Sequence, residues 1–100
     1  MKSADQLAAL GNELRLKVFR YVIKSGDEGV CAGEIANHFK VPASTLSAHL
    51  KTLQQNGLLK TRRSQQRIYY SVNHAQVRKL IQFLVSDCCA SSPELCGLEL

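Results

Sequence analysis

The strongest constraint on the fold is a change of hydrophobic period between residues 43 and 72. In "ASTLSAHLKTLQQ" the residues Leu46, Leu50 and Leu53 recur at helical spacing. "NG" then ends the helix, because glycine adopts the left-handed conformation of a helix end without strain. The following "LLKTRR" and "RIYYSV" alternate with period two, and "SQQ" between them predicts a hairpin loop. The segment therefore predicts a helix followed at once by a β-hairpin.

Three helices are predicted before this segment and one after it. Ser3 with Gln6 fits a capping box at the start of the first helix, and Asn12 is a typical N-cap for the second. The third, "AGEIANHFK", is short and lies one tight turn before the leucine-containing helix. Asn73 is the predicted N-cap of a last amphipathic helix. This order predicts a mainly α fold with a β-hairpin wing, which is a winged helix-turn-helix.

Positive charge is concentrated in one sector of the chain. Residues 40–79 contain eight Lys or Arg and no Asp or Glu, whereas the remainder carries five basic and eight acidic residues. A polyanion such as DNA would fit this sector, although a solvated basic surface is the ordinary alternative.

The polar face of the leucine-containing helix and the hairpin tip are the candidate DNA contacts. If the leucines face the core, the opposite face carries small side chains that let the backbone approach a groove floor. Hydroxyl and alanine side chains can also bond phosphates or touch a thymine methyl group. The tip adds arginines for phosphate or a narrow minor groove, and glutamines for groove edges. The predicted DNA-binding residues are Ser44, Thr45, Ser47, Ala48, Lys51, Arg62, Arg63, Gln65, Gln66 and Arg67.

The length of 100 residues fits one small domain. We expect this domain to span residues 1–89 and a flexible, cysteine-containing tail to span residues 90–100, where "SSPEL" combines a helix breaker with small polar residues. No run approaches the roughly 20 apolar residues of a membrane span, so no membrane partner is expected. Without a secretory cleavage pattern, the expected location is the cytoplasm, where thiols stay reduced.

The segments "ALGNELRLKVFRYV" and "GEIANHFKVPASTLSAHLKTLQQNGLLKTRRSQQRIYYSV" resemble the ArsR/SmtB family of bacterial regulators, in its arsenic-responsive repressor branch. The resemblance covers about residues 5–89. It implies a homodimer joined by the first and last helices, which binds palindromic operator DNA and represses a resistance operon until a metal or metalloid ion binds. The residues themselves support the dimer, because the apolar stripes of the first and last helices are too large for so small a chain to cover.

The sensing sites of this family differ between branches and are compared residue by residue. One arsenite site of the family is a C-x-C-x-x-C. Here only its first cysteine is present, as Cys31, and Gly33 and Ala36 stand at the other two places, so this site is not intact. The zinc branch uses paired ligands on the last helix. This chain has His74 at the start of that helix and Asp87 at its end, with no paired ligands between them, which argues against zinc. A further branch carries two adjacent cysteines at the end of the last helix and a third in the tail. The stretch "DCCASSPELC" is similar to that pattern.

Cys88, Cys89 and Cys96 are therefore the predicted metal ligands. Three thiolates suit a soft trivalent ion such as As(III) or Sb(III), whereas tetrahedral zinc would need a fourth ligand. A site of two thiolates would accept a trivalent methylarsenical, so the participation of Cys96 stays open. We expect no cofactor for folding. For Cys31 we favour a packing role as a small apolar residue.

The residues leave other functions open. A thiol-redox regulator of the same fold would pair Cys96 with Cys88 or Cys89 and respond to peroxide. An enzyme is not expected, because "CCASSPELC" has neither a glycine-rich anion cradle nor a following basic residue. A protein-interaction module that binds no DNA is disfavoured by the basic sector.

Overall fold

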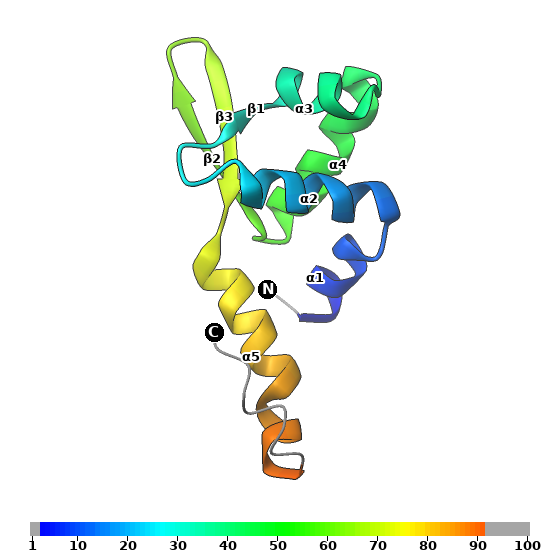
Figure 1. The fold of residues 1–100 in the computed structure, drawn as a ribbon, viewed down its shortest axis with the longest axis vertical. Coiled ribbons are helices and arrows are strands. Elements are labelled where there is room, and N and C mark those ends of the chain that lie inside the picture. Colours follow the sequence, from blue (N-terminus) through cyan, green and yellow to red (C-terminus); the bar gives the residue numbers. More distant parts are fainter. Residues whose placement is uncertain (1–2, 92–100) are drawn as a thin grey trace.

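The computed structural model of the chain describes residues 3–91, with side chains for residues 3–86. This part of the chain forms five helices and a three-stranded sheet, and Figure 1 shows how they are arranged. The fold is the predicted winged helix-turn-helix, mainly α with a β-hairpin wing. The elements are α1 (Ser3–Leu10), α2 (Glu13–Lys24), β1 (Val30–Cys31), α3 (Ala32–Phe39), α4 (Ala43–Gln55), β2 (Leu59–Ser64), β3 (Arg67–Val72) and α5 (His74–Ser91).

The core lies between α2, α3, α4 and the base of the hairpin. The three leucines of α4 are fully buried, as their spacing predicted. They pack in one cluster with Val18 of α2 and Ile35 of α3. Burial of each such side chain stabilises the fold by about 1.5–3 kcal/mol, so these contacts determine how α4 is rotated about its axis.

The predicted N-caps of α2 and α5 are confirmed. The side-chain oxygen of Asn12 accepts a hydrogen bond from the Arg15 amide at 3.0 Å. That of Asn73 accepts from the Gln76 amide at 3.3 Å. Each cap satisfies a backbone N–H that has no partner within its helix.

The capping box predicted for Ser3 and Gln6 is wrong in the role of Gln6. This side chain is buried, and its Nε2 donates to the Asn56 carbonyl oxygen at 2.9 Å and approaches Gln76 Oε1 at 3.4 Å. The amide therefore connects α1 to the end of α4 and to α5 instead of capping its own helix.

The sheet has a third strand that the sequence did not reveal. The order is β1-β3-β2, and both pairings are antiparallel. Strand β1 is only two residues long, with Val30 opposite Tyr70 and Cys31 opposite Tyr69. Two residues are too few for an alternating pattern, so β3 rather than local sequence determines that β1 is extended.

The hairpin loop is one residue shorter than the predicted "SQQ". Ser64 pairs with Arg67, which leaves Gln65 and Gln66 as a two-residue turn. Gln65 has a φ of 58°, in the region that two-residue hairpin turns require.

Helix α5 projects away from the rest of the molecule (Figure 1). Leu80 near its middle is buried, whereas Phe83 and Leu84 are 63% and 46% exposed. The helix continues through Ser91, so the backbones of Cys88 and Cys89 belong to it. Among the described residues, no helix has the length and apolar character needed to span a bilayer.

Candidate nucleic-acid interface

A tight turn joins α3 to α4 and completes the helix-turn-helix. Lys40 closes α3 in the left-handed conformation, with φ 55°. The amide of Val41 then donates to the Ala36 carbonyl at 3.2 Å, which reverses the chain. Pro42 is extended and immediately precedes Ala43, the first helical residue of α4.

The five residues predicted on the outer face of α4 are all exposed. This face is opposite the buried leucines and carries Ser44, Thr45, Ser47, Ala48 and Lys51. His49 lies on the flank of the helix and is half-buried. Small side chains around one lysine make a surface that a DNA groove can approach closely.

The five residues predicted in the wing are also exposed: Arg62, Arg63, Gln65, Gln66 and Arg67. Their environments differ. Among the described residues, the side chains of Arg63 and Arg67 make no hydrogen bond or ion pair, and the two glutamines form the turn between the strands. By contrast, the Arg62 guanidinium donates to the Glu28 carbonyl at 2.7 Å and stands 4.7 Å from the Tyr69 ring centroid.

Two acidic residues lie at the base of the wing, in the loop between α2 and β1. Asp27 accepts a hydrogen bond from His74 Nε2 at 2.9 Å, which connects this loop to the start of α5. Glu28 is the neighbour whose carbonyl binds Arg62. The charge of the wing is therefore positive at its tip and mixed at its base.

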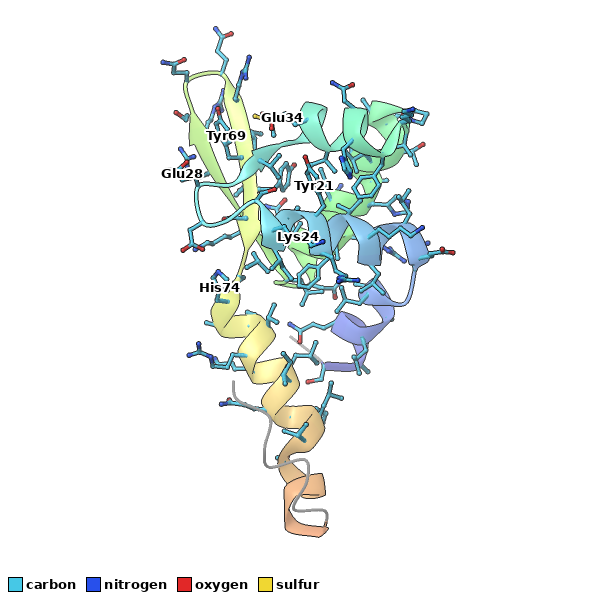
Figure 2. All side chains as sticks on the ribbon, in the orientation of Figure 1. Tyr21, Lys24, Glu28, Glu34, Tyr69 and His74 are labelled. Atoms are coloured by element: carbon cyan, nitrogen blue, oxygen red, sulfur yellow. The ribbon has the colours of Figure 1, made fainter. Side chains whose placement is uncertain are left out.

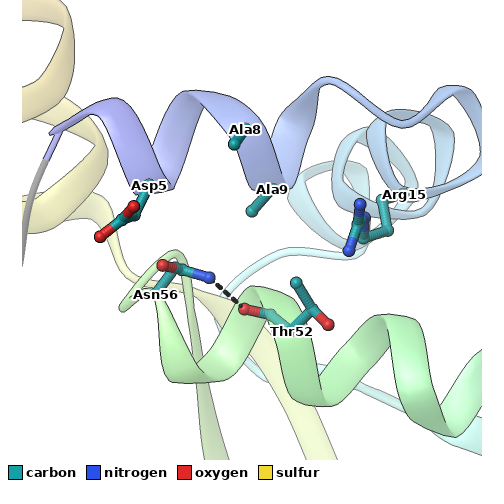
Figure 3. A pocket seen from close by; sticks show the side chains of 6 residues that line it. All are labelled: Asp5, Ala8, Ala9, Arg15, Thr52 and Asn56. Carbon is teal, nitrogen blue, oxygen red and sulfur yellow. Dashed lines mark hydrogen bonds between the residues drawn. The ribbon is translucent and has the colours of Figure 1, made fainter.

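A hollow of about 240 Å³ separates α1 from the C-terminal half of α4 (Figure 3). Asp5 and Arg15 lie at opposite ends of it, and Asn56 Nδ2 donates to the Thr52 carbonyl at 2.8 Å along its floor. Its lining carries one acidic and one basic residue, and it includes none of the ten predicted DNA-binding residues.

A second hollow, of about 530 Å³, lies between α3 and the wing. The half-buried free thiol of Cys31 lines it, together with Glu34 and Arg67. Within residues 3–86, no group of three His, Cys, Asp or Glu side chains could hold a metal ion. The side chains of Cys88 and Cys89, and all of Cys96, lie outside the described part of the chain.

The exposed α4 face, the helix-turn-helix and the basic wing together define a DNA-binding protein of the winged-helix class. A family model described as a helix-turn-helix domain matches residues 10–62. The chain is 30% identical over 83 residues to the transcriptional activator HlyU of Vibrio cholerae, covering 83% of this chain and 74% of that protein. It is 33% identical over 78 residues to the arsenical resistance operon repressor of Staphylococcus aureus, covering 78% and 72%.

Solved structures agree with this assignment. Reduced HlyU superimposes with a TM-score of 0.67 at 28% identity, covering 86% of this chain and 87% of that chain. The homodimeric winged helix-turn-helix DNA-binding domain Mb0332 of Mycobacterium bovis has a TM-score of 0.68 at 26% identity, covering 86% and 78%. The protein belongs to the ArsR/SmtB family of transcriptional regulators. These relatives are transcriptional regulators, in agreement with the prediction that this chain is a regulator and not an enzyme.

Proposed function

We propose that this protein represses an arsenic-resistance operon and leaves its operator when As(III) or Sb(III) binds the thiolates of Cys88, Cys89 and Cys96. The observation that carries the proposal is the position of the adjacent cysteines in α5, on the helix that projects from the body. Support also comes from the similarity to an arsenical resistance operon repressor. The site would form in the cytoplasm, where thiols remain reduced and available to the ion.

The DNA-contacting surface in this proposal consists of the exposed α4 face and the wing tip. Lys51, Arg63 and Arg67 would neutralise phosphates, and the exposed serines and threonine of α4 would lie closest to the bases. The two exposed glutamines of the turn would reach groove edges.

The partner in this proposal is a second copy of the chain, joined through α1 and α5. Leu7 on α1 is 40% exposed, and Phe83 and Leu84 on α5 are exposed as well. A dimer would cover these side chains, and the similar domain Mb0332 is homodimeric. The second copy would also place the two α4 helices about 34 Å apart, the spacing of successive major grooves.

The ion would act through this dimer. A site at the end of α5 lies on the proposed dimer face, so binding there would change how the two α4 helices are placed. Coupling of about 1–3 kcal/mol, which is typical of allosteric proteins, would be sufficient to release DNA.

A DNA-release titration tests the proposal. The probe is a labelled duplex from the region upstream of the gene, and the additions are arsenite, antimonite, methylarsenite, Zn²⁺ and peroxide. We expect arsenite and antimonite to release the wild type but not Cys89→Ser. The Cys96→Ser variant should keep its response to methylarsenite, because that ligand needs only two thiolates. If Cys89→Ser still left DNA normally on addition of arsenite, the proposal would be wrong.

A thiol-redox switch is the second candidate. It is favoured by the similarity to HlyU, a structure of which was solved in reduced form. In this case Cys96 would form a disulfide with Cys88 or Cys89, with peroxide as the two-electron oxidant and water as its product. Release by peroxide, reversed by dithiothreitol, together with no release by arsenite would favour this function over the first.

A further inference from the structure

Arg62 differs from the other arginines of the wing because its guanidinium already has two partners. Its Nη2 donates to the Glu28 carbonyl oxygen at 2.7 Å, and its Cζ stands 4.7 Å from the centroid of the Tyr69 ring. One partner belongs to the loop before β1 and the other to β3. Figure 2 labels Glu28 and Tyr69, and both lie on the wing side of the molecule.

The strand register explains this arrangement. Arg62 is directly opposite Tyr69, and residues opposite each other share one face of a sheet. Arg63 is opposite Ile68 and points to the other face, because successive residues of a strand alternate. Two neighbouring arginines, indistinguishable in the sequence, therefore face different surroundings.

Gly29 brings the loop against β3 and so fixes the carbonyl that Arg62 binds. Its φ is +91°, and a Cβ at this position would lie 2.9 Å from the Tyr70 carbonyl oxygen and 3.1 Å from Tyr69 Cβ. Only glycine permits this close approach without a shift of the backbone. The Glu28 carbonyl is thus a well-positioned acceptor.

The charges around Arg62 disfavour a phosphate as its partner. The loop that it contacts contributes the acidic residues Asp27 and Glu28, so the sequence beside the bonded carbonyl is negatively charged. Arg67 shares the face of Arg62 but is nearer the tip, where it pairs with Ser64. Arg63 points to the other face of the hairpin and Arg67 lies next to the turn, and neither side chain makes the contact with the loop that Arg62 makes. DNA that contacts the tip would therefore meet Arg63 and Arg67.

We propose that Arg62 positions the wing, whereas Arg63 and Arg67 contact DNA phosphates. This inference rests on the proposed role of the wing in DNA binding. The Arg62 guanidinium connects β2 to the loop before β1 through its hydrogen bond, and it lies over the Tyr69 ring of β3. Together these contacts hold the hairpin at a fixed angle to the helix-turn-helix. One planar guanidinium makes the hydrogen bond and the ring contact together, and the compact ammonium of lysine is less suited to do both, whereas a phosphate contact tolerates lysine.

Lysine substitutions separate the two roles. Arg62→Lys and the matched control Arg63→Lys preserve the charge of the protein. Each is titrated against a labelled duplex of mixed sequence, about 30 base pairs long, at about 50–200 mM salt. We expect Arg63→Lys to bind within about twofold of the wild type. We expect Arg62→Lys to bind about three- to tenfold more weakly, because it loses the directed hydrogen bond and the ring contact.

Tyr69→Leu provides a second test that changes no charge. It should weaken DNA binding about as much as Arg62→Lys, and the double variant should bind no more weakly than either single variant. Wild-type affinity for Arg62→Lys together with no effect of Tyr69→Leu would show that these contacts do not position the wing and would overturn the inference.

Hydrogen exchange tests the positioning role without DNA. The amides of β2 and β3 should exchange faster in Arg62→Lys than in Arg63→Lys, because the hairpin loses its attachment. Unchanged exchange in Arg62→Lys would overturn the inference even if the wild type bound DNA. A wild type that bound no duplex at any salt concentration would instead contradict the proposed function, and the exchange result would still decide the role of Arg62.

Discussion

Gln6 provides the most informative test of how the helices are held together. Its side chain is 3% exposed, and its Nε2 donates to the Asn56 carbonyl, at the C-terminal cap of α4. Gln6→Met keeps the length and approximate volume of the side chain but removes the amide. The Asn56 carbonyl then loses its donor in a partly buried site.

The expected loss of stability follows from this geometry. Leaving a buried acceptor without a partner costs about 1–3 kcal/mol. The Gln76 contact at 3.4 Å is at the limit of hydrogen-bond distance and adds little. Because methionine recovers some apolar burial, we expect a loss of about 1–2 kcal/mol in the free energy of unfolding. For a domain of this size, this loss of free energy corresponds to a decrease in Tm of about 4–16 °C.

Urea and thermal unfolding at one fixed protomer concentration measure this loss, since dimerisation would make the apparent stability concentration-dependent. Gln76→Met is the matched control, because it removes only the long contact and should cost less than about 0.5 kcal/mol. A decrease below about 0.5 kcal/mol for Gln6→Met, or equal decreases for both variants, would refute the reasoning.

Three further predictions concern the core, the loop and the isolated thiol. Leu50→Ala should lower the free energy of unfolding by about 2–5 kcal/mol in a urea titration, because the side chain is fully buried. Gly29→Ala should cost about 1–3 kcal/mol in the same assay, since it combines a positive φ with a contact of 2.9 Å to the Tyr70 carbonyl. Cys31→Ser should leave arsenite-induced DNA release unchanged, and a lost response would show that Cys31 is a ligand.

The orientation of α4 could be predicted because it depends on local spacing. Leucines at intervals of four and three residues define one face of a helix, and burial of that face exposes the opposite one. The N-caps at Asn12 and Asn73 were also predictable, because each bonds an amide three residues further along the chain.

The features that could not be predicted depend on contacts between distant residues. Strand β1 is extended because β3 pairs with it, and its two residues carry no periodic signal. Local spacing predicts a capping role for Gln6, whereas its hydrogen-bond partner Asn56 is 50 positions away. For a buried amide, a distant carbonyl without a partner is as suitable an acceptor as a near one, and only the fold determines which is within reach.

The wing shows the same division for the candidate site. The sequence by itself determined that a basic hairpin follows α4, because period-two alternation and the run of arginines are local properties. Only the tertiary structure decided which arginine of the wing contacts other parts of the described chain and which ones are left exposed without such a contact. The register places Arg62 against Tyr69, and Gly29 brings the Glu28 carbonyl to it, 34 positions away in the chain. Local spacing determines which face of an element is buried, whereas the partner of a polar group is determined by the segments that the fold brings beside it.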